Sequence, residues 1–161
     1  FDLVAKDYPT VECDYGYIDA FMQWLIRTPE HYDVIACSNM FGDIATDLGA
    51  VLQGGMGMAA SGNIGAEHAF FEPVHGSSPK HAGLNKVNPI ASINSIQLMI
   101  EWLGRRNNIG GFKIIGRQID ESVAEHILEG KMLAYDLGGT SGCSHVGEAI
   151  ANRLASKLSE L

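Results

Sequence analysis

Short apolar runs alternate with helical stripes along this chain, and this alternation constrains its fold more than any other feature. Val11–Tyr15 and Val34–Cys37 are β-type runs, whereas Ile18–Ile26 carries apolar residues at the helical period. Phe70–Pro73 is typical of the end of another strand. Strands that alternate with helices are typical of α/β proteins. The sequence therefore predicts an α/β fold.

Three helices are predicted in the second half of the chain. The first begins at Pro89, which suits an opening turn, and ends at Gly104. The second covers Ile119–Leu128 with Asp120 as its cap, and the third is capped by Ser144. The apolar stripes of the first and third helices consist of Ile93, Ile96, Ile100 and Leu103, and of Val146, Ala149, Ile150, Leu154 and Leu158.

Glycines are concentrated between Gln53 and Gly65, and within this stretch Gly55–Ala60 looks like a dinucleotide fingerprint. A true fingerprint follows a strand and opens a helix, whereas this stretch follows a predicted helix. We therefore exclude a fingerprint and interpret the stretch as a crossover where backbones pack closely. A polar loop is predicted over 75–88, and a second glycine-rich loop over 136–144.

Composition excludes several classes of partner. A net charge of -8 argues against a nucleic-acid partner, because phosphate binding requires a basic surface. No apolar run approaches the roughly 20 residues of a membrane span, so no membrane partner is expected. The three cysteines are odd in number and show no paired spacing, which favours a reducing cytoplasm. The opening FDLVAKDYP resembles the end of a helix, so we expect this to be the C-terminal part of a longer protein.

The segment SNMFGDIATDLG, residues 38–49, is the strongest candidate for chemistry. It places Asp43 and Asp47 one helical turn apart on one face. Such a pair is either a solvated acidic face or a site for Mg²⁺ or Mn²⁺, which prefer hard oxygen ligands. Apolar residues crowd the same helix, so much of it is expected to be buried: Met40, Phe41, Ile44, Ala45, Leu48, Val51 and Leu52.

Four blocks in order, NMFGDIATDLG, FEPVHGSSPKHAG, VNPIAS and DLGGTSG, resemble the β-decarboxylating dehydrogenases. That family includes 3-isopropylmalate, isocitrate, homoisocitrate, tartrate and D-malate dehydrogenases. The resemblance runs from about Tyr8 to the C-terminus. It implies the isocitrate/isopropylmalate dehydrogenase-like fold, which is not a Rossmann fold, and it implies that this chain contains only the C-terminal half of that fold. It implies that residues 1–53 are part of the substrate-binding and dimerisation domain. Residues 54–161 are then the C-terminal part of the cofactor-binding domain.

The resemblance implies a metal site that two subunits share. Asp43 and Asp47 match the family's metal-binding pair, and Asp19 matches a third aspartate that reaches the metal of the neighbouring subunit. Taken alone, Asp19 is a helix-start carboxylate favoured by the helix dipole. A metal site shared between two chains implies a homodimer. Apolar surface that a monomer could not bury is then expected on residues 41–52 and on Ile18, Phe21, Met22 and Leu25.

The resemblance also implies a site for NAD or NADP. The matching residues are Glu72, His75, Gly76, Ser77, Ser78, Lys80, His81, Asn88 and Asp136. His75 is otherwise a structural histidine of a surface loop, and Asp136 a turn residue. NAD-using relatives often carry an aspartate at the position of Lys80, and NADP-using isocitrate relatives often have Lys-Tyr. Lys80-His81 would tolerate a 2′-phosphate, so the choice between NAD and NADP stays open.

The implied function is the metal-dependent oxidative decarboxylation of a small 2-hydroxy acid. The family's catalytic tyrosine and lysine, and the arginines that clamp its substrate, come from the N-terminal half of its members. The resemblance therefore implies no catalytic residues in this chain beyond the metal ligands. The alternative is a non-catalytic regulatory subunit of a heteromeric dehydrogenase of the same family. The three aspartates favour the enzyme. The remaining acidic group, Glu121, Glu125 and Glu129, is interpreted as a solvated helix face.

Overall fold

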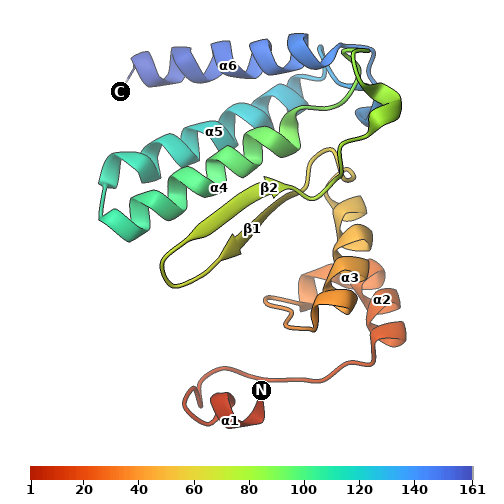
Figure 1. Cartoon of the computed structure of the whole chain (residues 1–161), viewed down its shortest axis with the longest axis vertical. Coiled ribbons are helices and arrows are strands. Elements are labelled where there is room, and N and C mark those ends of the chain that lie inside the picture. The colour runs from red at the N-terminus through yellow and green to blue at the C-terminus, as the bar shows by residue number, and fades with distance from the viewer. Residues whose placement is uncertain (161) are drawn as a thin grey trace. The chain divides into compact units, whose positions relative to one another are not determined.

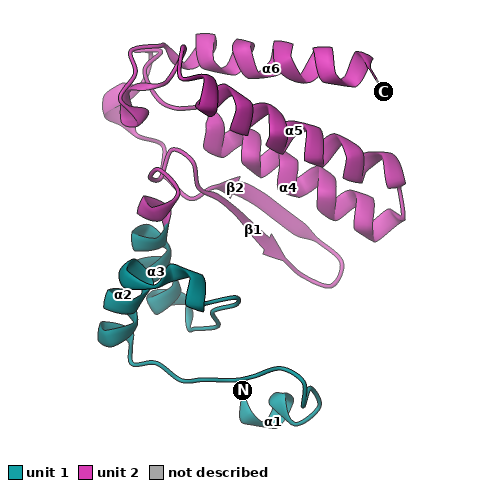
Figure 2. Cartoon of the chain, turned by 180° about the vertical axis from the view of Figure 1, so that it is seen from behind, with its two compact units in different colours: residues 1–49 teal, residues 50–161 magenta. Residues whose placement is uncertain are grey.

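The computed structural model describes residues 1–160, and the chain divides into two compact units (Figure 2). Unit 1 comprises residues 1–49 and unit 2 begins at Ala50. The elements of unit 1 are α1 (Asp2–Ala5), α2 (Ile18–Arg27), the short 3₁₀ turn η1 (Pro29–His31) and most of α3 (Asn39–Leu52). The helices expected around Ile18–Ile26 and around Asp43 are therefore present.

Unit 1 has a small core between α2 and α3. Phe21, Leu25 and Ala45 are buried there, and the Tyr32 ring packs edge-on to Phe21 with centroids 5.1 Å apart. Phe21 and Leu25 were expected to need a second chain to bury them. That expectation is wrong, because α3 and Tyr32 of the same chain cover these side chains.

Neither strand predicted in unit 1 forms. Residues 11–15 and 34–37 have no strand assignment, and Val34 is 89% exposed. A β-strand needs a partner to satisfy its backbone hydrogen bonds, and a single ladder is marginal even when it has one. The described residues of unit 1 contain no strand that could pair with these runs. Their apolar pattern alone is therefore not enough to form a strand.

The exposed surface of α3 also differs from the expectation. Ala45 and Ala50 are buried, and Leu48 is partly buried against the core of unit 1. The other large apolar side chains are exposed in the single chain: Met40, Phe41, Ile44, Val51 and Leu52. Within unit 1, α2 and Tyr32 pack on only one face of α3. Most of this apolar helix therefore has no cover from the described part of unit 1.

Unit 2 is a stack of four layers. The hairpin of β1 (Ala60–Ile64) and β2 (Ala69–Pro73) packs on α4 (Ile90–Asn107), which packs on α5 (Gly110–Glu129), which packs on α6 (Cys143–Ser159) (Figure 1). The strands are antiparallel, with Ala60 opposite Pro73 and Ile64 opposite Ala69. Two 3₁₀ turns, η2 (Pro79–His81) and η3 (Tyr135–Leu137), lie in the loops. The strand expected at Phe70–Pro73 is confirmed, whereas β1 was not predicted.

The core of unit 2 lies at the starts of α4 and α6 and beside the C-terminal half of α5. Its buried apolar side chains are Ile90, Val123, Ala134, Val146 and Ile150. Val146 and Ile150 belong to the predicted stripe of α6 and are almost fully buried. Burying a side chain of this size contributes about 1.5–3 kcal/mol. This core therefore fixes the end of the stack where the long loops meet.

The predicted start at Pro89 and the predicted end near Leu128 are confirmed, whereas three other predicted helix ends in unit 2 are wrong by two residues or more. Gly104 does not end α4: it is buried, and an added Cβ would lie 2.8 Å from the Cβ of Phe112, so glycine lets α5 pack closely there. Left-handed Asn108 ends α4 instead. Asp120 lies inside α5, which already begins at Gly110.

The start of α6 also differs, because Gly142 occupies the N-cap position and Ser144 lies in the first turn.

The acidic face of α5 is not simply solvated. Lys157 Nζ lies 2.7 Å from Glu125 Oε1 and 3.6 Å from Glu121 Oε2, and Arg153 joins Glu125 to Glu129. These ion pairs between α5 and α6 correct the prediction of a purely solvated face. Cations one turn apart on α6 meet carboxylates at matching spacing on α5.

Across residues 1–160, no helix combines the length and apolar character needed to cross a membrane.

Candidate functional site

Asp43 and Asp47 lie on consecutive turns of α3, as their spacing predicts. Both residues are exposed in the single chain. Asn39 Nδ2 donates a hydrogen bond of 2.9 Å to Asp43 Oδ2, which orients that carboxylate from the turn before it. The pair therefore presents hard oxygen atoms on an accessible helix face, as a divalent cation requires.

Asp19 lies in the first turn of α2, where its Oδ1 accepts a hydrogen bond of 2.8 Å from the Ala20 backbone N–H. Within the described part of one chain, no three His, Cys, Asp or Glu side chains gather closely enough to hold a metal ion. Two carboxylates leave most of the six positions around Mg²⁺ to other ligands. Asp43 and Asp47 thus fit a cation whose remaining ligands come from elsewhere.

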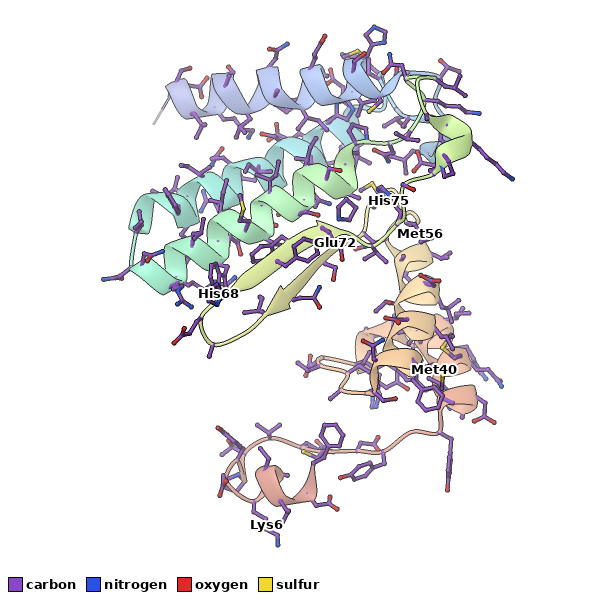
Figure 3. All side chains as sticks on the ribbon, in the orientation of Figure 1. Lys6, Met40, Met56, His68, Glu72 and His75 are labelled. Carbon is purple, nitrogen blue, oxygen red and sulfur yellow. The ribbon has the colours of Figure 1, made fainter. Side chains whose placement is uncertain are left out.

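The residues expected to bind a cofactor lie mainly on the β2–α4 loop, residues 74–89. Glu72 lies on β2 and His75 lies just beyond the end of that strand (Figure 3). Gly76, Ser77, Ser78 and Lys80 are exposed, and His75 and His81 are half-buried. His75 Nδ1 is 2.9 Å from the Gly76 carbonyl oxygen. The loop therefore displays most of its polar groups on the surface of unit 2.

Asn88 and Asp136 come together although 48 residues separate them in the chain. Asn88 is buried, and its Nδ2 donates a hydrogen bond of 3.2 Å to Asp136 Oδ2. Its Oδ1 accepts a hydrogen bond of 3.0 Å from the Ile90 N–H, which satisfies one of the free donors at the start of α4. The contact links the β2–α4 loop to η3.

Gly57 makes this contact possible. A Cβ built at Gly57 would overlap Asp136 Oδ2 and would lie 3.0 Å from the Asn88 Cβ. The Gly57 carbonyl also accepts a hydrogen bond of 2.9 Å from the Ala91 N–H. The close packing expected in the glycine-rich stretch is therefore confirmed at this position.

Next to the Asn88–Asp136 contact, Tyr135 packs against His81 and Lys86, and these five residues form one cluster. Sequence reasoning did not single out Tyr135 or Lys86. The His81 ring stacks on the Tyr135 ring at 5.9 Å between centroids, and Lys86 Nζ lies 4.7 Å from the same centroid. Ser78 Oγ is 2.8 Å from His81 Nδ1, so it helps to orient that ring. The only sequence signal was their position, directly before Asp136 and two residues before Asn88.

The donor set of this cluster fits the adenosine end of a dinucleotide. Small residues at 76–78 let the backbone approach a phosphate. Exposed Asp136 offers a carboxylate for a base or ribose, and buried Asn88 holds that carboxylate in place. Lys80 and Lys86 supply positive charge on a chain whose net charge is -8. These two cations balance Glu72 and Asp136 of the same group, so the acidic total does not exclude an anionic ligand here.

Comparison with known proteins identifies the family. Residues 1–150 match the profile described as isocitrate/isopropylmalate dehydrogenase. This chain belongs to the isocitrate/isopropylmalate dehydrogenase family. It is 43% identical over 155 residues to 3-isopropylmalate dehydrogenase of Thermobifida fusca, covering 94% of this chain and 41% of that protein. It is 40% identical over 158 residues to homoisocitrate dehydrogenase of Methanocaldococcus jannaschii, covering 98% of this chain and 43% of that protein.

Solved structures of the isocitrate/isopropylmalate dehydrogenase family share the fold. Isocitrate dehydrogenase from Methylococcus capsulatus gives a TM-score of 0.86 at 36% identity, covering 95% of this chain and 44% of that one. A β-decarboxylating dehydrogenase from Thermococcus kodakarensis gives 0.80 at 35% identity, covering 95% and 43%. The expected family and fold are therefore confirmed. The chain spans less than half the length of these relatives.

Proposed function

We propose that this chain is part of a metal-dependent NAD(P) dehydrogenase that oxidises and decarboxylates a small 2-hydroxy acid. The observation that carries the proposal is the meeting of Asn88 and Asp136 beside the β2–α4 loop in a member of this family. Residues 54–161 then serve as the C-terminal part of the cofactor-binding domain. Residues 1–53 serve as part of the substrate-binding and dimerisation domain.

The proposed metal ligands are Asp43 and Asp47 of one chain with Asp19 of a second copy. Their support is the shared face of α3 and the exposure of Asp19 on α2. Bound Mg²⁺ or Mn²⁺ would polarise the substrate hydroxyl and α-carboxylate and stabilise the negative charge that develops as CO₂ leaves. The three carboxylates would hold the ion beside the substrate.

A homodimer is part of the proposal because a shared metal site needs two chains. Met40, Phe41 and Ile44 are 61%, 38% and 52% exposed, and they lie on the same helix as the proposed ligands. Contiguous exposed apolar residues typically mark an interaction surface. A two-fold axis beside α3 would bury this surface and bring Asp19 of each chain towards the partner's α3.

The β2–α4 loop is proposed to bind the adenosine end of NAD or NADP with Glu72, His75, Asn88 and Asp136. Lys80 is proposed to lie beside the ribose 2′ position, with His81 held next to it by Ser78 and Tyr135. A cation there attracts a 2′-phosphate, whereas an aspartate would repel it. The proposal therefore includes NADP as a cofactor that this loop accepts.

The test is an assay of the full-length natural protein with Mn²⁺, both cofactors, and four acids: isopropylmalate, D-malate, tartrate and isocitrate. Reduced nicotinamide and released CO₂ are measured together. Equal formation of both with one acid is the expected result. Turnover of none of the four, with intact folding, would favour the non-catalytic regulatory subunit instead.

A further inference from the structure

We propose that Asn85 is a positioning residue that anchors the β2–α4 loop to the first turn of α6. The inference rests on the proposed function, because it concerns how that loop is prepared for a cofactor. Asn85 is exposed and was not among the expected cofactor residues. Its contacts nevertheless span 59 residues of sequence.

Three hydrogen bonds join Asn85 to α6. The Oδ1 atom accepts from the Ser144 backbone N–H at 2.8 Å, and Nδ2 donates to Ser144 Oγ at 2.9 Å. The Asn85 backbone carbonyl accepts from the Cys143 N–H at 2.8 Å. The first N–H groups of a helix have no partner inside it. Asn85 thus supplies from a distant loop the cap that Gly142, which has no side chain, cannot supply.

The backbone on both sides is shaped for this contact. Asn85 has a φ of 50°, in the left-handed region that asparagine tolerates better than most residues. A Cβ at Gly142 would lie 2.7 Å from Asn85 Nδ2 and 2.9 Å from its carbonyl oxygen. Glycine at 142 therefore allows the approach, and asparagine at 85 suits both the turn and the hydrogen bonds.

The anchor lies between the loop residues that are proposed to contact the cofactor. Asn88 holds the following end of the loop through Asp136, and His81 rests on Tyr135 before it. α6 in turn is fixed by the buried side chains of Val146 and Ile150. An exposed loop that is tied at these points loses less freedom when a ligand binds, and that saving appears as affinity.

The variants are compared in the full-length natural protein. Asn85→Gly keeps the positive φ and the backbone carbonyl but removes both side-chain hydrogen bonds. Asn85→Asp keeps an acceptor for the Ser144 N–H, and a carboxylate is favoured at a helix N-terminus. Asn152→Ala, an exposed asparagine on α6, serves as the matched control. Binding is measured by calorimetry with ADP-ribose and its 2′-phosphate form, and turnover is measured separately.

For Asn85→Gly we expect the Kd of the better ADP-ribose form and the KM of the matching cofactor to rise by about three- to tenfold, because the released loop must be ordered again when the ligand binds. The kcat at saturating cofactor and the KM of the acid should stay within about twofold. Hydrogen exchange over 76–84 should become faster in the unliganded variant. Asn85→Asp should recover most of the affinity, and Asn152→Ala should match the wild type.

Each contrary outcome has a distinct meaning. A wild type that bound neither ADP-ribose form nor either cofactor would refute the proposed function, and the inference with it. A wild type that bound normally, with an unchanged Kd in Asn85→Gly, would refute only the inference. Equal losses in kcat, in both KM values and in Tm, without recovery in Asn85→Asp, would make Asn85 a purely structural residue and would also overturn the inference.

Discussion

The proposed site residues of unit 1 lie apart in one chain, whereas those of unit 2 come together. In unit 2, residues that are far apart in sequence meet within one chain, as Asn88 does with Asp136 and Asn85 with Ser144. In unit 1, the three aspartates do not form one group, and much of α3 is apolar and exposed.

The difference follows from how much apolar surface each unit buries. Unit 2 stacks its hairpin and three helices over a core with almost fully buried residues such as Ile90 and Val146. Unit 1 has a core of only Phe21, Leu25 and Ala45. The proposed cofactor site in unit 2 can therefore form within one chain, whereas the proposed metal site on α3 needs a second surface to complete it. Substitutions in unit 1 are therefore expected to change metal affinity, and substitutions in unit 2 are expected to change cofactor affinity.

The largest expected effect lies in unit 1. Asp43→Asn should lower activity and Mn²⁺ affinity of the full-length protein by about a hundredfold or more, because the ion loses a charged ligand. Tm without metal should stay near the wild-type value, since Asp43 is exposed. Asp33→Asn, another exposed aspartate of unit 1, is the control. Full activity in Asp43→Asn would remove the metal role.

Gly57→Ala tests the close contact in unit 2. The added methyl group would overlap Asp136 Oδ2 and displace it from Asn88, and overpacking of this kind costs about 1–3 kcal/mol. We expect a cofactor KM at least about tenfold higher, together with a lower Tm. Gly111→Ala has open space around its Cβ and should leave both values unchanged or raise Tm slightly. Normal cofactor affinity in Gly57→Ala would contradict the proposed site.

Lys80→Asp should have a smaller effect, confined to cofactor choice. Replacing a cation with an anion beside a 2′-phosphate should shift the ratio of kcat/KM values towards NAD by about fivefold or more at low salt. The shift should shrink as salt is added. A native preference for NAD that this substitution leaves unchanged would show that Lys80 does not lie at the ribose 2′ position.

Glu125→Gln should have the smallest effect, on the ion pairs between α5 and α6. The hydrogen bond from Lys157 holds the pKa of Glu125 below its ordinary value of 4.5, and in turn raises that of Lys157 above 10.5. The contribution of Glu125 to stability is therefore present above its unfolded pKa and is lost as the pH falls through the folded one. Glu125→Gln should lower Tm slightly at neutral pH, and the difference should vanish in acid. Glu148→Gln, exposed on α6, is the control.

Features that depend on residues only a few positions apart could be predicted from the sequence. The helical period of Ile18–Ile26, the turn spacing of Asp43 and Asp47, and the buried stripe through Val146 and Ile150 all appear in the structure. The four motif blocks identified the family, which the comparisons confirm.

Features that depend on distant partners could not be predicted. The run at Val34–Cys37 has a strand pattern but no strand to pair with among the described residues of unit 1. Gly104 was predicted to end a helix because glycine commonly does so. Its actual role, close packing against Phe112, is a tertiary contact that the local sequence does not show. Asn85, Lys86 and Tyr135 act across long sequence separations, so no local pattern marked them.

Mixing two inactive variants tests the central claim, that Asp19 of one chain completes the metal site on α3 of another. Full-length Asp19→Asn and Asp43→Asn are each inactive in this account. A mixed dimer of the two contains one site with all three aspartates and one site with none of the contributions from Asp19 or Asp43. When equal amounts exchange subunits at random, half of the dimers are mixed, so about a quarter of wild-type activity should return. No recovery, despite proven subunit exchange, would place Asp19 and Asp43 in the same chain's site or outside it and would contradict the account.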